Sequence, residues 1–175
     1  MRRAVLTLLV ALPFLAACGG DGPNDADSEL AASLIEQRAA GIELANTTIG
    51  RDRLSPRIAQ LAEQIRVDGT ADIDALAALL KEWGEKAPRT GFGTGDGHTP
   101  HEDGHGDLEK LAAASDARFE RAWLERMIAH HQEALTLAAE IEERGESEEL
   151  AGEVDETVAT LEAELERMRG WLGET

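Results

Sequence analysis

The chain has 175 residues and a formal net charge of −18 at pH 7, with 17 basic against 35 acidic residues. A surface this acidic repels phosphate groups and attracts cations, so it excludes nucleic acid as a partner and favours metal ions. The length suits one domain. Aromatic residues make up only 3% of the chain and tyrosine is absent, a composition that favours helices over sheets.

Residues 1–17 are predicted to be a targeting segment that is removed from the mature protein. Arg2 and Arg3 precede the apolar run 4–17, which is shorter than the roughly 20 residues of a membrane-spanning helix and is typical of an export signal. The run ends in Leu15-Ala-Ala-Cys18, which resembles a bacterial lipobox. The resemblance implies a lipid on Cys18, and we therefore expect an extracytoplasmic protein that is anchored to the cell membrane; a plain secretory signal is the alternative. Cys18 is the only cysteine, so no disulfide can form within the chain.

Residues 18–27 form a flexible tether, and helical patterns follow it. Apolar residues at helical spacing predict helices from about Ser28 to 50, from Ser55-Pro56 to Trp83 with a kink or break at Gly69, from Ser115 or Asp116 to Gly145, and from Ser147 onward. A long glycine- and histidine-rich loop, 84–106, precedes a short helical turn at 107–114. Four helices of comparable length predict an all-α four-helix bundle over residues 28–175.

The two halves of this bundle repeat one another. Residues 34–45 match residues 127–138 at a constant offset of 93, and apolar positions in 61–83 match those in 150–172 at an offset of 89. This pattern indicates a duplicated helical hairpin, in which 28–83 is the first half and 107–175 is the second.

Two adjacent histidines, His130 and His131, interrupt an otherwise amphipathic helix. His130 falls on the row of apolar residues that should face the core, and His131 falls at its flank with Met127 one turn earlier. Two neutral imidazoles beside a thioether could hold copper or zinc. In the alternative without metal, His130 bonds to a buried carboxylate or to Gln37 across the bundle.

Three further histidines, His98, His101 and His105, lie among carboxylates in the 84–106 loop. A flexible segment can gather three imidazoles around Cu(II), Zn(II) or Ni(II), so these residues are a second candidate metal site. The alternative is a solvated polar loop that binds metal only incidentally.

The segment Phe119-Glu120…Trp123-Leu124…Met127-Ile-Ala-His-His131…Ala134, together with Glu164-Leu165…Met168…Trp171-Leu172, resembles the domain of unknown function 305 family. The resemblance covers the chain after the tether and implies a ferritin-like duplicated bundle in an exported protein, often a lipoprotein, with links to metal and especially copper.

One departure from the family pattern concerns the first half of the duplication. Members usually carry the histidine pair in both halves, whereas this chain has Gln37-Arg38 there, and arginine cannot ligate a metal. The resemblance thus implies a one-sided site that is built from His130, His131 and Met127, with Glu120 as a nearby carboxylate.

No motif for catalysis is present. There is no Glu-x-x-His di-iron pattern on a helix, no His-Glu-x-x-His pattern and no phosphate-binding glycine loop, so an enzyme is not expected. The sequence favours a lipid-anchored metal-binding protein for copper sequestration or delivery, whose partners are a metal ion and the membrane, with pairing into a homodimer left open. The alternative is a structural or interaction bundle of the cell envelope that binds no specific metal.

Overall fold

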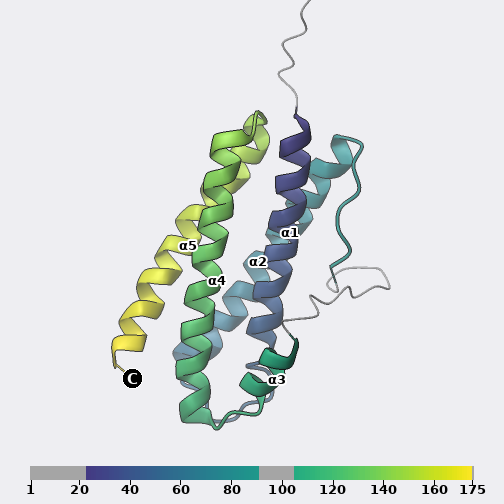
Figure 1. Ribbon diagram of the computed structural model, residues 1–175. Coiled ribbons are helices and arrows are strands. Elements are labelled where there is room, and N and C mark those ends of the chain that lie inside the picture. Colours follow the sequence, from purple (N-terminus) through teal and green to yellow (C-terminus); the bar gives the residue numbers. More distant parts are fainter. Residues whose placement is uncertain (1–22, 91–104, 175) are drawn as a thin grey trace, which may run out of the picture.

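The computed structural model describes residues 23–90 and 105–174, and its regular structure there consists of five helices without a strand (Figure 1). Their bounds are α1 Asp25–Asn46, α2 Pro56–Glu82, α3 His105–Ala112, α4 Asp116–Arg144 and α5 Glu148–Glu174. Four of these helices are long, and α3 is a short helix beside the beginning of α4. Within these two ranges, no helix combines the length and the apolar character that crossing a membrane would require.

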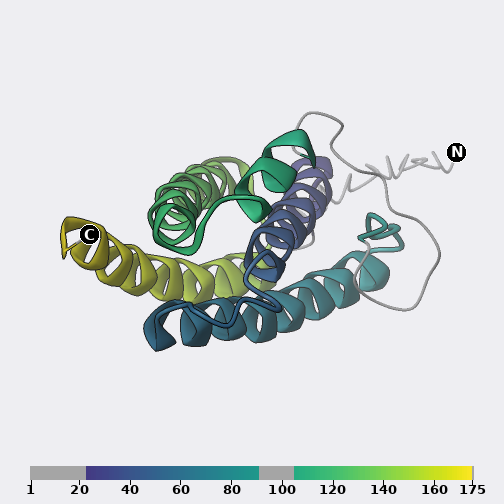
Figure 2. The same ribbon diagram turned by 90° about the horizontal axis from the view of Figure 1, so that it is seen from below.

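The four long helices form a bundle of two antiparallel hairpins (Figures 1 and 2). The α1–α2 hairpin packs against the α4–α5 hairpin through α1 with α4 and through α2 with α5. Because α2 ends at one end of the bundle and α4 begins at the other, α2 and α4 run parallel (Figure 1). A bundle with one long crossover connection is the ferritin-like topology. The predicted fold class is therefore confirmed.

The buried apolar side chains form two separate clusters along the bundle. One contains Phe119, Trp123 and Met127 around the start of α4, and the other contains Leu34, Leu76, Val154 and their neighbours. Between the two clusters lies a layer of polar side chains from all four long helices. Burying polar groups costs free energy of folding unless they bond to one another. Because a purely apolar core would avoid this cost, we expect a functional site in this layer.

The start of α1 is tied to the turn between α4 and α5. Asn24 and Asp27 form a reciprocal capping box, so α1 begins at Asp25 rather than near Ser28. The buried carboxylate of Asp27 also accepts hydrogen bonds from the backbone N–H groups of Glu146 and Ser147, at 3.0 and 3.3 Å. These hydrogen bonds join the first residues of one hairpin to the turn of the other.

Of the kink or break predicted at Gly69, the break is wrong, because α2 continues through this residue. Gly69 is buried, and a Cβ atom there would lie 3.2 Å from Cγ1 of Ile42 on α1. The glycine thus permits a close approach of α1 and α2.

Candidate metal centre

His130 and His131 face different neighbours in the bundle. The His131 ring is buried, with 1% of the residue exposed, and points to α5, whereas His130 is half-buried and points to α1. The ring centroids are 6.0 Å apart, at an interplanar angle of 67°. The expectation that His130 is the inward residue and His131 its flank is therefore wrong: the inner line of α4 runs through Trp123, Met127 and His131, in steps of one turn.

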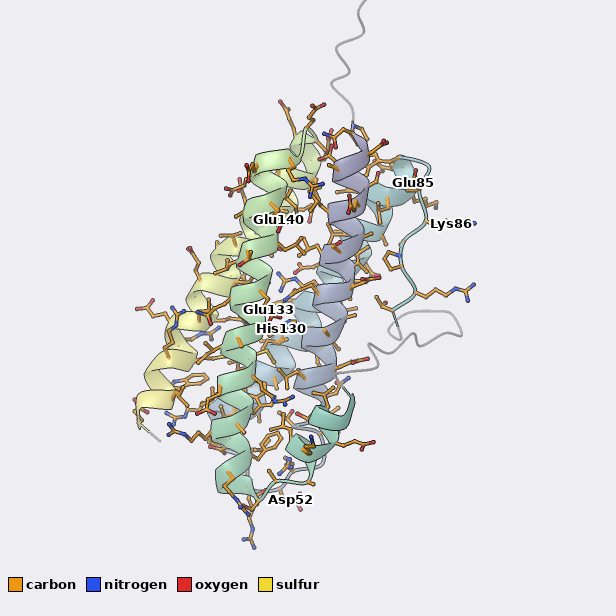
Figure 3. All side chains as sticks on the ribbon, in the orientation of Figure 1. Asp52, Glu85, Lys86, His130, Glu133 and Glu140 are labelled. Carbon is orange, nitrogen blue, oxygen red and sulfur yellow. The ribbon has the colours of Figure 1, made fainter. Side chains whose placement is uncertain are left out.

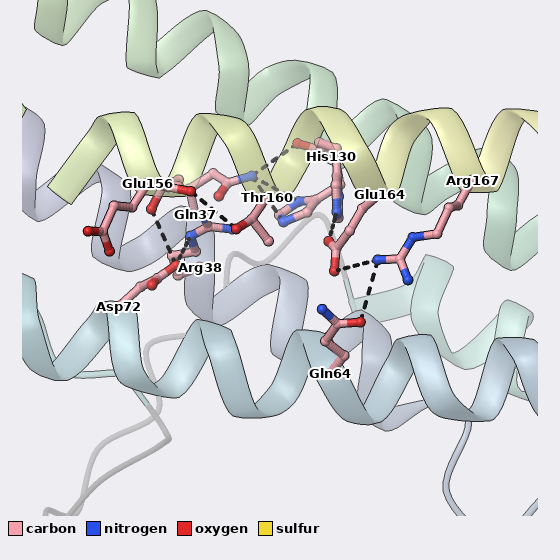
Figure 4. A network of polar contacts seen from close by, with 11 residues as sticks. Gln37, Arg38, Gln64, Asp72, His130, Glu156, Thr160, Glu164 and Arg167 are labelled. Carbon is pink, nitrogen blue, oxygen red and sulfur yellow. Dashed lines mark hydrogen bonds and ion pairs between the residues drawn. The ribbon is translucent and has the colours of Figure 1, made fainter. Parts of the chain in front are cut away.

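His131 is paired with a buried carboxylate on α5. Its Nε2 lies 2.6 Å from Oε2 of Glu164, a residue that is only 3% exposed (Figure 4). A carboxylate only accepts, so in the neutral ring Nε2 carries the proton and Nδ1 presents a lone pair. Among the described residues, neither His131 Nδ1 nor Glu164 Oε1 has a hydrogen-bond partner. A histidine that donates one N–H to a carboxylate and offers its other nitrogen has the arrangement of a metal-ligating histidine.

His130 is held by Gln37 of α1, as the alternative without metal predicted for this residue. The Gln37 amide Nε2 donates to the His130 carbonyl oxygen at 3.0 Å and lies 3.0 Å from the ring Nε2 (Figure 4). Gly41 leaves room for the ring, since a Cβ atom there would be only 2.6 Å from that nitrogen. Burial, with smaller effects of His131 and Arg38, lowers the pKa of His130 to about 3. His130 is thus a neutral imidazole at physiological pH.

This lowered pKa predicts a pH-dependent stability of the metal-free protein. The unfolded chain takes up a proton at His130 near pH 6.5, while the folded chain does so only near pH 3. The contribution of a neutral His130 is therefore complete above about pH 6.5 and is lost as the pH falls toward 3. Chemical unfolding of wild type and His130→Gln between pH 7 and pH 4 should show the wild type losing more stability. A constant difference between the two proteins would contradict this prediction.

In the first half of the duplication, the counterparts of His130 and His131 are Gln37 and Arg38, and each forms polar contacts with another residue of the bundle. Gln37 binds His130, and the two residues are 93 positions apart, which is also the offset of the sequence repeat. Positions that correspond in the two halves therefore meet between α1 and α4. Arg38 reaches across to α2, where its Nε lies 2.9 Å from Oδ2 of Asp72 (Figure 4). Burial raises the pKa of Asp72, and Arg38 opposes that shift. Each hairpin therefore pairs one nitrogen-bearing side chain with a carboxylate, and the His131–Glu164 pair is the more deeply buried of the two.

A pocket of about 250 Å³ opens onto this polar layer, between the two hairpins. Arg38, Asp72, His130, His131 and Glu164 line it. It is large enough for an ion with its ligands. Among its lining residues, Arg38 Nε, His131 Nδ1 and Glu164 Oε1 are buried atoms without a hydrogen-bond partner.

Two buried thioethers lie one turn from the His131–Glu164 pair. Met127 is one turn before His131 on α4, and Met168 is one turn after Glu164 on α5; both are 0% exposed and share one apolar cluster. Because α4 and α5 are antiparallel, one turn back along α4 and one turn forward along α5 point toward the same end of the bundle (Figure 1). Met127 and Met168 therefore lie at the same height along the bundle axis. Helical side chains lean toward the N-terminus of their helix, which brings His131 toward Met127 and Met168 toward Glu164. Imidazole and thioether together form a soft donor set that suits Cu(I).

Glu120 does not belong to this site. Its carboxylate accepts a hydrogen bond from the backbone N–H of Ser55, the N-cap of α2. It lies eleven residues before His131, which is roughly 16 Å along a helix. The prediction that Glu120 is near the histidines is therefore wrong, and its role is to support the start of α2.

The remaining predicted site residues lie outside the described residues or have side chains that are not described. His98, His101 and Cys18 lie outside the described residues, and His105 is the first residue of α3, with a side chain that is not described. Over the part of the chain that is described, no three histidine, cysteine, aspartate or glutamate side chains are arranged to hold a metal ion.

Sequence reasoning did not assign Glu164, Met168 or Arg38 to the site. In the last helix, Met168 belonged to the apolar row and Glu164 stood beside it, and their spacing of one turn was the available signal. Nothing in the sequence pairs them with His131, because that pairing depends on the register of α4 against α5. On α4, which Figure 3 shows with its side chains, His130 is half-buried, whereas Glu133 and Glu140 are exposed.

A duplicated four-helix bundle with a buried histidine–carboxylate layer defines the class of this protein. The chain belongs to the family described as domain of unknown function (DUF305), whose model matches residues 27–172. No curated protein matches the chain. A solved DUF305 fragment from Deinococcus radiodurans is similar, with 20% identity, a TM-score of 0.71 and coverage of 87% of this chain and 98% of that one.

Solved structures of CopM are similar as well. The Cu(I)-bound form has 21% identity and a TM-score of 0.68, with coverage of 85% of this chain and 96% of that one. The Cu(II)-bound form has 23% identity, a TM-score of 0.69 and the same coverage. At these identities the likeness shows a shared fold.

Proposed function

We propose that this chain is an exported, lipid-anchored protein that binds copper in the interior of its bundle, for sequestration or delivery and without catalysis. The observation that carries the proposal is the state of His131, which lines the pocket: its buried Nδ1 has no hydrogen-bond partner among the described residues, while its Nε2 bonds to Glu164. A neutral imidazole that is oriented in this way is prepared to accept a metal. The anchor rests on the sequence of residues 1–18 alone.

Copper is favoured over zinc by the donors near the pocket. Zinc sites use histidine, cysteine and carboxylate ligands, and the described residues offer no such group of three. Met127 and Met168 instead add soft sulfur to His131, which suits Cu(I) and Ag(I). The copper- and silver-bound forms of CopM, which has the same fold, support this assignment.

The residues would share the binding as follows. His131 Nδ1 and the two thioethers would be the ligands, Glu164 would orient the His131 ring, and His130 could add a second imidazole after release from Gln37. The bound ion would be held away from solvent by the apolar cluster around Trp123 and Met127. His98, His101 and His105 would at most assist from the loop.

Metal titration of the detergent-solubilised full chain tests this proposal. Anaerobic calorimetry with Cu(I), and with Ag(I) as its redox-stable counterpart, should show stoichiometric binding. His131→Gln keeps an N–H donor for Glu164 but removes the imidazole, and it should weaken binding about tenfold or more. The matched variant His130→Gln should have a smaller effect, since Gln37 already occupies that ring. Replacing the three loop histidines with glutamine should leave the stoichiometry unchanged.

The alternative is a structural bundle that binds no specific metal. It is favoured by one observation, namely that both histidines already have partners within the chain, Gln37 and Glu164. Under this alternative, His131→Gln would leave Ag(I) binding unchanged while lowering stability. That result would overturn the copper proposal.

A further inference from the structure

We infer that Gln37 is a positioning residue that holds His130 back from the metal, so that the bundle offers a bound ion one imidazole and gains the second only when Gln37 is displaced. This inference rests on the proposed function and adds what controls the entry of His130 into the same site. It is carried by the contacts of the Gln37 amide with the ring and with the backbone of His130 (Figure 4).

The backbone of His130 fixes the orientation of the Gln37 amide. The amide nitrogen Nε2 lies 3.0 Å from the carbonyl oxygen of His130, an atom that only accepts hydrogen bonds. If the amide were turned over, its own oxygen would face that carbonyl oxygen, and two acceptors repel each other. Gln37 therefore presents N–H groups, and not its oxygen, to His130.

This orientation decides which nitrogen of His130 carries the lone pair. The amide nitrogen of Gln37 is 3.0 Å from the ring Nε2 and 3.4 Å from the ring Nδ1. A neutral imidazole has one nitrogen with a proton and one with a lone pair, and only the second accepts a hydrogen bond. The shorter contact assigns the lone pair to Nε2 and the proton to Nδ1. The nitrogen with which His130 could bind a metal is thus the one that Gln37 occupies.

Gly41, one turn after Gln37 on α1, makes room for this arrangement. A Cβ atom at position 41 would lie 2.6 Å from His130 Nε2, so the glycine leaves a space that the tip of the ring fills. His131, by contrast, bonds to Glu164 on α5 and has an Nδ1 without a hydrogen-bond partner in the described part of the chain. Of the two imidazoles, His130 is therefore turned toward α1 and held there.

Distance does not prevent the two rings from sharing an ion. With metal–nitrogen bonds of about 2.1 Å, two imidazoles on one ion can have ring centroids up to roughly 6.5 Å apart. The centroids of His130 and His131 are 6.0 Å apart. The amide oxygen of Gln37 is buried and has no hydrogen-bond partner among the described residues, which costs free energy. This cost weakens the hold of Gln37, so the amide can yield when His130 turns to an ion.

The test uses the detergent-solubilised full chain, in which the three loop histidines are replaced with glutamine. His130 and His131 are then the two histidines that remain of five. Nitrogen NMR of this metal-free parent protein should show His130 with its proton on Nδ1 and with Nε2 as a hydrogen-bonded acceptor. After one equivalent of Ag(I) is added, the nitrogen signal of His131 should show coupling to silver, and that of His130 should not.

Two substitutions should admit His130 to the site by different means. Gln37→Leu keeps most of the side-chain volume but removes both N–H donors, and Gly41→Ala places a methyl group where the ring lies. In each variant, silver coupling should appear at His130 as well, and calorimetry should show an affinity for Ag(I) that is about tenfold higher. A purely structural role of Gln37 would not produce this coupling.

Two further variants serve as controls, and circular dichroism should show every variant folded. The double variant Gln37→Leu/His130→Gln should return to the affinity of the parent protein, because the gain passes through His130. Gln60→Leu makes the same exchange at an exposed position of α2 and should change neither the coupling nor the affinity.

The outcomes separate this inference from the proposed function. Absence of stoichiometric Ag(I) binding to the parent protein would overturn the proposed function, and the inference with it. Stoichiometric binding with silver coupling at both histidines of the parent protein would overturn the inference alone. A proton on Nε2 of His130 in the metal-free protein, or a raised affinity that persists in the double variant, would do the same.

Discussion

Replacing both Met127 and Met168 with leucine should lower the affinity for Ag(I) and Cu(I) more than about 100-fold, which corresponds to about 2.7 kcal/mol. Both side chains are fully buried in one apolar cluster, at the same level of the bundle, one turn from His131 and Glu164. Leucine has nearly the volume of methionine but no sulfur, so the exchange removes two soft ligands and costs less than about 1.5 kcal/mol of stability per site.

The readout is competitive Ag(I) titration, with chemical unfolding of the metal-free variants to show that the fold is intact. Leu150→Met is a suitable control, because it makes the same kind of exchange in the other apolar cluster and should leave Ag(I) affinity unchanged. Each single methionine variant should fall between wild type and the double variant. Wild-type affinity in the double variant would exclude a thioether site. The loop histidines would then be the preferred candidate ligands.

The Trp123→Ala variant should lose about 3–5 kcal/mol of stability, the largest expected loss for a substitution in this protein. Trp123 is completely buried at the centre of the cluster that lies below the polar layer. Its indole Nε1–H also donates to the backbone oxygen of Leu44 on α1, at 3.0 Å. The variant thus leaves both a cavity and a buried carbonyl that has lost its donor.

Equilibrium unfolding in urea at pH 7 measures this loss. Trp123→Phe should cost less than Trp123→Ala, because it keeps most of the apolar volume and loses mainly the hydrogen bond. Trp171→Ala provides the matched control, since Trp171 is only half-buried at the end of α5, where its ring packs against Arg57 at 5.4 Å. Equal losses for Trp123→Ala and Trp171→Ala would contradict the central place of Trp123.

Much of the fold could be predicted because helical periodicity is a local property of the chain. The apolar rows marked four long helices, and the glycine at 145 and the serines at 55 and 115 lie where helices end or begin. The two segments that match in sequence, 34–45 and 127–138, lie on α1 and α4, and these helices contact each other where Gln37 bonds to His130. Local signals were less accurate at Gly69, where packing against Ile42 overrides the low helix propensity of glycine.

The candidate site was predicted only in part. The histidine pair stands out in the sequence, but a single helix does not reveal which ring its neighbours will cover. The structure buries His131 against Glu164 and leaves His130 to Gln37, and it removes Glu120 to the start of α2. These assignments depend on the register between helices, which no pattern within one helix contains.

The sequence by itself determined the helical class, the duplication, the acidic surface and the loss of histidines at Gln37-Arg38 in the first half. Only the tertiary structure decided which groups share the interior. It brought Arg38 and Asp72 into one polar layer with His131 and Glu164, and it set Met127 level with Met168. The physical reason is that composition and periodicity act along one helix, whereas the charge and donor set of a buried pocket arise from four helices that meet.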